Sequence, residues 1–127
     1  MNPIRLRRFD ATLSVCRLSP DEPLAAWMQQ GPLWSVSRTP DELSVVCSSE
    51  YAPAGIRQEG PFAVFAVEGP LAFSLTGILS RLSVPLAEAG IPLFVISTFD
   101  TDYVLVSEER AVDAIRCWQA AGMEGVA

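Results

Sequence analysis

Ile96-Ser97-Thr98-Phe99-Asp100-Thr101-Asp102-Tyr103-Val104-Leu105-Val106 is a stretch in which a short polar connection joins two apolar runs. Apolar runs of four to eight residues that are bounded by turn residues are typical of buried β-strands. We therefore expect two antiparallel strands, Leu93 to Thr98 and Tyr103 to Val106, joined by a hairpin. The polar connection between them, residues 98–102, is called the clasp below.

A helix is expected on each side of this hairpin. Upstream, the pattern predicts a helix from Gly77 to Ala89, with Thr76 as its N-cap and Gly90 as its C-terminal stop. Downstream, Ser107 precedes a second predicted helix that ends at Gly122. The residues expected to face inward are Ile78, Leu79, Leu82 and Leu86 in the first helix, and Ala111, Val112, Ile115 and Trp118 in the second.

The first half of the chain repeats this plan in shorter form. Strands are expected at 13–18, 34–38 and 43–47, with a short helix at 24–30 and a linker at 51–60. Sliding Val36–Glu50 by 59 positions onto Val95–Glu109 gives six identities in fifteen positions without a gap. The sequence therefore predicts a degenerate tandem repeat, with one module at residues 1–60 and another at residues 61–127.

Each module follows a β-α-β-β order with a possible further helix and strand. Short hairpins and right-handed crossovers fold such a unit into an α+β ferredoxin-like arrangement, an antiparallel sheet with helices on one face. Strands such as Phe62 to Val67 are apolar on both faces, so the second face also needs a cover. That cover is expected to be the sister repeat or a second copy of the chain, and a homodimer is predicted.

Composition argues against several functional classes. The net charge of −6 disfavours a nucleic-acid partner, and the basic cluster Arg5, Arg7 and Arg8 is expected to be a solvated arm. The chain contains neither histidine nor lysine, which removes the commonest general base, the commonest metal ligand and Schiff-base chemistry. We therefore expect no catalysis, no metal and no cofactor.

The predicted location is the cytoplasm. No apolar run is long enough to span a bilayer, and the first 18 residues do not resemble a signal peptide. The three cysteines, Cys16, Cys47 and Cys117, are an odd number without a C-x-x-C spacing, and each lies among apolar neighbours. They are expected to be reduced and buried.

The residues of the second half resemble the ACT domain. The likeness is carried by Thr76-Gly77-Ile78-Leu79, by Leu86-Ala87-Glu88-Ala89-Gly90-Ile91 and by the hairpin quoted above. It extends over residues 61–120 and is similar to the branch that contains the regulatory modules of aspartate kinases and the cytosolic arginine sensors of the animal nutrient pathway. This resemblance implies an amino-acid-binding regulatory module that acts on a downstream protein, with its ligand at an interface between modules.

Carried over residue by residue, the resemblance implies ligand contacts at Gly77, Ile78, Thr98, Phe99 and Asp102. Elementary chemistry agrees, because a helix N-terminus can bind a carboxylate through backbone amides and an aspartate can hold an ammonium or guanidinium.

Two simpler readings remain open. Asp100 and Asp102 are also typical turn formers, and the domain could have kept its fold as a scaffold without a ligand. The tryptophans Trp27, Trp34 and Trp118 are expected in the core.

Overall fold

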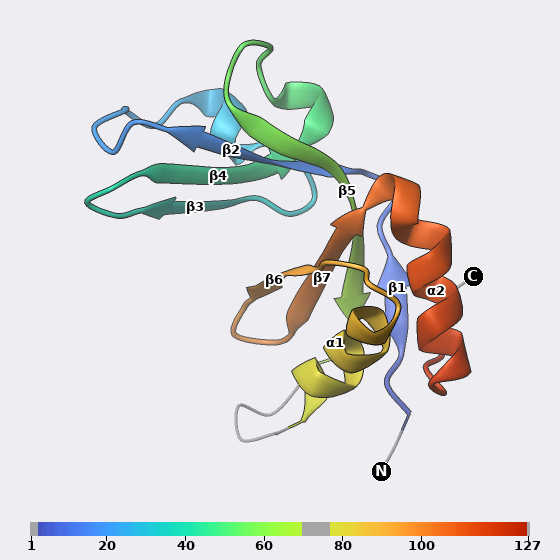
Figure 1. Ribbon diagram of the computed structural model, residues 1–127. Helices are drawn as coiled ribbons and strands as arrows, with labels where there is room; N and C mark the ends of the chain where they lie inside the picture. Colours follow the sequence, from blue (N-terminus) through green and yellow to red (C-terminus); the bar gives the residue numbers. More distant parts are fainter. Residues whose placement is uncertain (1–2, 70–76, 127) are drawn as a thin grey trace. The chain divides into compact units, whose positions relative to one another are not determined.

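The computed structural model describes residues 3–69 and 77–126 (Figure 1). It divides into two compact units, of which unit 1 combines Met1–Phe9 with Ala63–Ala127 and unit 2 is Asp10–Phe62. The boundary predicted between residues 60 and 61 therefore falls inside one strand, β5 (Gln58–Val67), which continues from unit 2 into unit 1.

Unit 1 has the expected ferredoxin-like plan. Its strands are β1 (Leu6–Arg8), the second part of β5, β6 (Phe94–Ser97) and β7 (Asp102–Ser107), in the order β1-β5-β7-β6. β1 pairs antiparallel with β5, and β6 pairs antiparallel with β7. The helices are α1 (Ile78–Glu88) and α2 (Ala111–Ala120), the latter preceded by a 3₁₀ turn, η3 (Glu108–Arg110). The α+β fold prediction is confirmed.

The N-terminal segment is a strand, and the expectation of a solvated arm is wrong. Leu6 lies opposite Val67 and Arg8 lies opposite Phe65 in the ladder between β1 and β5. The reason is a short alternation in which Ile4 and Leu6 are apolar and their neighbours are not, so that both side chains enter the core. β1 thereby fills the outer strand position that residues 123–126 leave almost empty, since these described residues form a single bridge, between Arg5 and Glu124.

The core of unit 1 lies between the sheet and the two helices. Trp118 is fully buried, its indole Nε1 donates a hydrogen bond to the Leu82 carbonyl at 2.9 Å, and its ring meets Phe65 edge-on at 4.9 Å. The core prediction holds for this tryptophan, whereas Trp34 is 44% exposed.

The helix faces differ from the prediction at two positions. Leu79 and Val112 are 46% and 57% exposed, and Ala114 is buried instead. Buried positions in α2 repeat at intervals of three and four residues from Ala111, and Val112 falls outside that stripe. The N-cap of α1 is Gly77, with a φ of 82°; the predicted cap, Thr76, lies outside the described residues.

Unit 2 has the same strand order as unit 1. Its strands are β2 (Leu13–Leu18), β3 (Ser35–Arg38), β4 (Leu43–Ser48) and the first part of β5, in the order β3-β4-β2-β5. In place of helices it has two 3₁₀ turns, η1 (Ala26–Gln29) and η2 (Ser49–Tyr51). The predicted helix at 24–30 is therefore one short turn, and the predicted linker at 51–60 is shorter because β5 already begins at Gln58.

The two hairpins correspond residue by residue at the offset of 59. β3 and β6, β4 and β7, and η2 and η3 have bounds that differ by this number. The turns also share hydrogen bonds: Thr39 N donates to Glu42 O at 2.9 Å, and Thr98 N donates to Thr101 O at 2.8 Å. In each turn the threonine hydroxyl also bonds the backbone three residues later. Thr98 thus has an architectural role that its counterpart shares.

The cysteines are free, and two of them are fully buried. Cys16 and Cys47 lie in the core of unit 2 beside Met28, whereas Cys117 is half-buried. Burial, with the neighbouring Cys47 thiol as a smaller cause, raises the pKa of Cys16 to about 11, and burial also raises the pKa of Cys47. Both thiols therefore stay protonated at neutral pH, and they react slowly because the thiolate is the reactive form.

Candidate functional site

A cleft of about 480 Å³ lies on unit 1 beside the clasp. Its size falls in the range of small-molecule sites, about 300–1,000 Å³. β1, the end of β5, the clasp and the start of β7 contribute its walls. The lining residues are Arg7, Ala66, Val67, Glu68, Gly69, Asp100, Thr101 and Tyr103.

Strand pleating explains which residues reach the cleft. Leu6, Val67 and Val104 belong to the core under the helices. Side chains alternate along a strand, so Arg7, Ala66 and Tyr103 point to the opposite face of the sheet. The cleft therefore collects residues of the helix-free face together with the loops that border it.

An aromatic pair orients the only guanidinium in the lining. The Arg7 guanidinium carbon lies 5.0 Å from the centroid of the Phe9 ring. The Phe9 ring meets Tyr103 edge-on, with 5.8 Å between centroids. A cation over an aromatic ring gains about 0.5–1 kcal/mol at an exposed site, which is enough to favour one rotamer of the arginine. Arg7 is thus held over the sheet face while its N–H groups remain available.

A hydrogen bond links the clasp to the end of β5. The Thr101 hydroxyl donates a hydrogen bond of 2.6 Å to the Val67 carbonyl. The neighbouring Asp100 is exposed at the rim of the cleft. Thr101 therefore holds the clasp next to the end of β5, one residue before Glu68.

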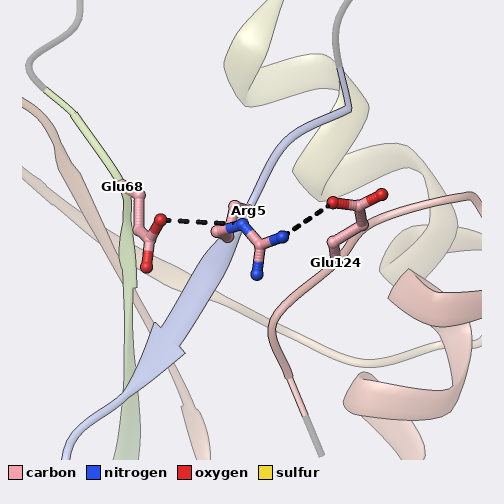
Figure 2. A network of polar contacts seen from close by, with 3 residues as sticks. All are labelled: Arg5, Glu68 and Glu124. Atoms are coloured by element: carbon pink, nitrogen blue, oxygen red, sulfur yellow. Dashed lines mark hydrogen bonds and ion pairs between the residues drawn. The ribbon is translucent and has the colours of Figure 1, made fainter.

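Two ion pairs connect Glu68, the residue after β5, through Arg5 to Glu124 (Figure 2). The Arg5 guanidinium lies 3.0 Å from a Glu124 carboxylate oxygen and 3.8 Å from one of Glu68. All three side chains are about half exposed, so the pairs contribute little to stability. Arg5 thereby links Glu68, at the rim of the cleft, to Glu124.

The charges of the cleft are separated. Arg7 supplies a positive group on β1, and Asp100 supplies a negative group on the clasp. Among the ion pairs found in residues 3–69 and 77–126, none includes either of these two side chains. Two opposite charges that do not neutralise each other are complementary to a ligand that carries both signs.

The residues predicted as ligand contacts do not line this cleft. The Thr98 hydroxyl bonds Thr101 within the turn, and Asp102 accepts a 2.6 Å hydrogen bond from the Ser97 hydroxyl. Phe99 is 79% exposed, and Ile78 packs against the core of unit 1. Gly77 starts α1, and its carbonyl accepts a hydrogen bond from Ser80. The structure therefore brings Thr98 and Asp102 into one hairpin, and the five-residue site stays a prediction.

Sequence reasoning missed Arg7 and Tyr103. Tyr103 adjoins the predicted contact Asp102, and the strand pleat sends its side chain to the other face. Arg7 falls in the segment predicted to be a solvated arm, although the alternation of apolar and charged residues from Ile4 to Arg7 is a signal of a half-buried strand.

Two features are absent from the part of the chain that the structure describes. No helix there is long and apolar enough to cross a membrane. In the same residues, no group of three or more cysteine, aspartate or glutamate side chains is arranged to hold a metal ion.

Comparison with known proteins agrees with this architecture. The model of the ACT domain matches residues 58–119, and a model of an N-terminal domain matches residues 12–55. The crystal structure of protein Atu0741 from Agobacterium tumefaciens has a TM-score of 0.91 and 35% sequence identity, and the match covers 99% of this chain and 94% of that one.

Two more distant structures share the fold. A Vibrio cholerae protein of unknown function, described as a possible transport protein, matches with a TM-score of 0.76 and 21% identity over 94% of this chain and 91% of its own. The ligand-free regulatory subunit of aspartate kinase from Thermus thermophilus matches with a TM-score of 0.66 and 14% identity over 92% of this chain and 96% of its own. The chain therefore belongs to the family that includes protein Atu0741, and its residues 58–119 match the model of the ACT domain.

Proposed function

We propose that this chain is a regulatory protein that binds a small zwitterion, an amino acid or a close analogue, in the unit 1 cleft and performs no catalysis. The observation that carries the proposal is the pair of separated charges, Arg7 and Asp100, in a cleft of ligand size on an ACT domain. The fold shared with the aspartate kinase regulatory subunit supports a regulatory role.

In this arrangement three residues of the cleft each contact a different part of the ligand. The Arg7 guanidinium binds the ligand carboxylate, because its fork of N–H donors matches two oxygens. Asp100 binds the ammonium group, and the Tyr103 ring packs against the aliphatic part of the ligand. The absence of histidine and lysine supports binding over catalysis, since the usual proton-transfer groups are missing.

Replacing Arg7 with glutamine is expected to weaken ligand binding by about tenfold or more, because one charge-assisted hydrogen-bonding group is worth about 1.5–3 kcal/mol. The ligand is first identified by a thermal-shift screen of the proteinogenic amino acids. At a hundred times its dissociation constant a ligand adds about 2.7 kcal/mol, which raises the melting temperature of a protein of this size by about 8 °C or more. Titration calorimetry then compares the variants.

The control is Arg8→Gln, which removes the same charge from the neighbouring position of β1, outside the cleft lining. An unchanged affinity in Arg7→Gln would contradict the assignment of the cleft. Asp100→Ala and Asp102→Ala separate the two possible anionic contacts, since only the first lies in the cleft and the second is the residue predicted from sequence. If no amino acid shifts the melting temperature, the scaffold function becomes the better account.

The proposal extends to the first half of the chain, which we regard as a degenerate ACT-like module. The shared strand order, the offset of 59 and the repeated turn hydrogen bonds support this tandem arrangement. The free cysteines support a reducing, cytoplasmic location. The downstream protein that such a regulator acts on would be recognised by a surface whose exposure depends on the ligand.

A homodimer is part of the same proposal. β6 lies at the end of the strand order in unit 1, so one side of its backbone has no strand partner among the described residues, and Phe94 on it is 40% exposed. An open edge with an exposed aromatic residue favours pairing with another strand. Sedimentation equilibrium should give a molecular mass of twice that of one chain, and the Phe94→Glu variant should have a lower measured mass. A monomer mass at micromolar concentration would rule the dimer out.

A further inference from the structure

We propose that unit 2 carries a second binding cleft for a small zwitterionic ligand, at the position that corresponds to the unit 1 cleft. The cleft has a volume of about 200 Å³, less than half that of the first. It is built entirely from residues of unit 2. The lining residues on which the comparison rests are Arg17, Glu42, Ser44, Arg57 and Glu59.

The correspondence begins with the third strand of each sheet. The offset of 59 between β4 and β7 places Ser44 at the position of Tyr103. In the turn that precedes each strand, it places Glu42 at the position of Thr101. Both members of each pair line their respective clefts.

The first strand of each sheet fixes a second relation. In unit 2, Leu18 lies opposite Leu43, the first residue of β4. In unit 1, the Thr101 hydroxyl bonds the Val67 carbonyl, which places Val67 beside the start of β7. Leu18 therefore corresponds to Val67, and one residue earlier Arg17 corresponds to Ala66. Arg17 and Ala66 both line their clefts.

The outer strand of each sheet completes the comparison. Arg7 lies opposite Ala66 in the ladder between β1 and β5. The equivalent neighbour of Arg17 is Arg57, whose carbonyl accepts a 2.9 Å hydrogen bond from the Arg17 amide. An arginine thus occupies the same place in both clefts, although β1 supplies it in one unit and the residue before β5 supplies it in the other.

The lining of the second cleft carries both signs of charge. Arg17 and Arg57 are matched in number by Glu42 and Glu59, and the ion pairs found in the described residues include none of the four. The Arg17 guanidinium donates one hydrogen bond of 3.1 Å to the Asp41 carbonyl, which directs the guanidinium toward the turn. Arg17, Arg57 and Glu59 are exposed and Glu42 is half-buried, so these four charges form a complementary surface for a ligand with a carboxylate and an ammonium group.

The smaller volume limits the ligand. Ser44 replaces the ring of Tyr103, but Arg17 replaces the methyl group of Ala66 and fills part of the space. We therefore expect the second cleft to favour amino acids with short side chains, with the Arg57 guanidinium on the carboxylate and Glu42 or Glu59 on the ammonium. The assignment goes beyond the proposed function, because it can hold whether or not the first cleft is occupied.

The test compares two matched variants, Arg57→Gln and Arg7→Gln, with Arg116→Gln on the exposed side of α2 as the control. Glycine, L-alanine and L-serine are the probes, and L-leucine and L-phenylalanine serve as larger comparisons. Binding is followed by titration calorimetry and by amide chemical shifts of the ¹⁵N-labelled protein. Arg57→Gln should weaken the binding of a short probe to the unit 2 cleft by about tenfold or more. It should leave unchanged any binding in the unit 1 cleft, which is the binding that Arg7→Gln weakens. The shifted amides should lie in β2 and β4.

Two results would overturn the inference. One is a short probe whose binding is lost in Arg7→Gln and kept in Arg57→Gln, which would leave the proposed function intact with a single site. The other is the absence of any saturable shift in β2 or β4 with all three short probes. Loss of binding in Arg57→Gln alone would support the second cleft and contradict the first, so the two proposals fail separately.

Discussion

Trp118→Ala is expected to lower the free energy of unfolding by about 3–5 kcal/mol, the usual cost of truncating a buried large aromatic residue. The side chain is fully buried, contacts Phe65 edge-on and donates its indole N–H to the Leu82 carbonyl. Its removal leaves a cavity between α1 and α2 and takes away the hydrogen bond that links the two helices. Since the free energy of unfolding of small proteins is about 5–15 kcal/mol, this one substitution should remove a large part of the stability of the protein.

Urea denaturation followed by circular dichroism measures the effect, with Trp34→Ala as the matched control. Trp34 is 44% exposed, and its truncation should cost less than about 1 kcal/mol. Trp118→Phe separates the hydrogen bond from the packing, because it keeps most of the ring and loses the donor. Equal effects in the two alanine variants would show that the core of unit 1 is not centred on Trp118.

Leu6→Ala is expected to destabilise the protein by about 2–5 kcal/mol, as for other buried leucines. Leu6 is 1% exposed and packs in the core of unit 1 although it lies near the beginning of the sequence. Arg8→Ala on the same strand is the control, and it should cost about 0.5–1 kcal/mol through the lost contact with Phe65. If residues 5–8 were a solvated arm, both substitutions would be close to neutral in the same denaturation assay.

The hairpins could be predicted from sequence because their signals are local. Thr98 and Thr39 each bond the backbone three residues later, so the turn is specified by the residues inside it. The positions of the two unit 1 helices were also readable, since periodicity and terminal glycines mark them, whereas the helix predicted at 24–30 is one 3₁₀ turn. The buried faces of the helices were less so, because leucine and valine at Leu79 and Val112 look identical in sequence to core residues.

Features that depend on distant pairing could not be derived in the same way. β1 is three residues long, and its partner on β5 lies nearly sixty residues away. The predicted contact Asp102 and the cleft residue Tyr103 are neighbours in sequence and occupy opposite faces of a strand, so a difference of one residue changes the face of the sheet on which a site lies. The choice between such neighbours depends on where the helices lie, which the hairpin residues do not encode.

Because β5 pairs with strands of both units, insertions and deletions within this strand should be poorly tolerated in this family. Its first part pairs with β2 in unit 2, and its second part pairs with β1 in unit 1. One residue gained or lost between residues 62 and 65 would turn every following side chain of the strand to the other face. Homologous chains should therefore vary in length in the connection between η2 and β5, where surface loops tolerate change, and keep a constant spacing within β5 itself.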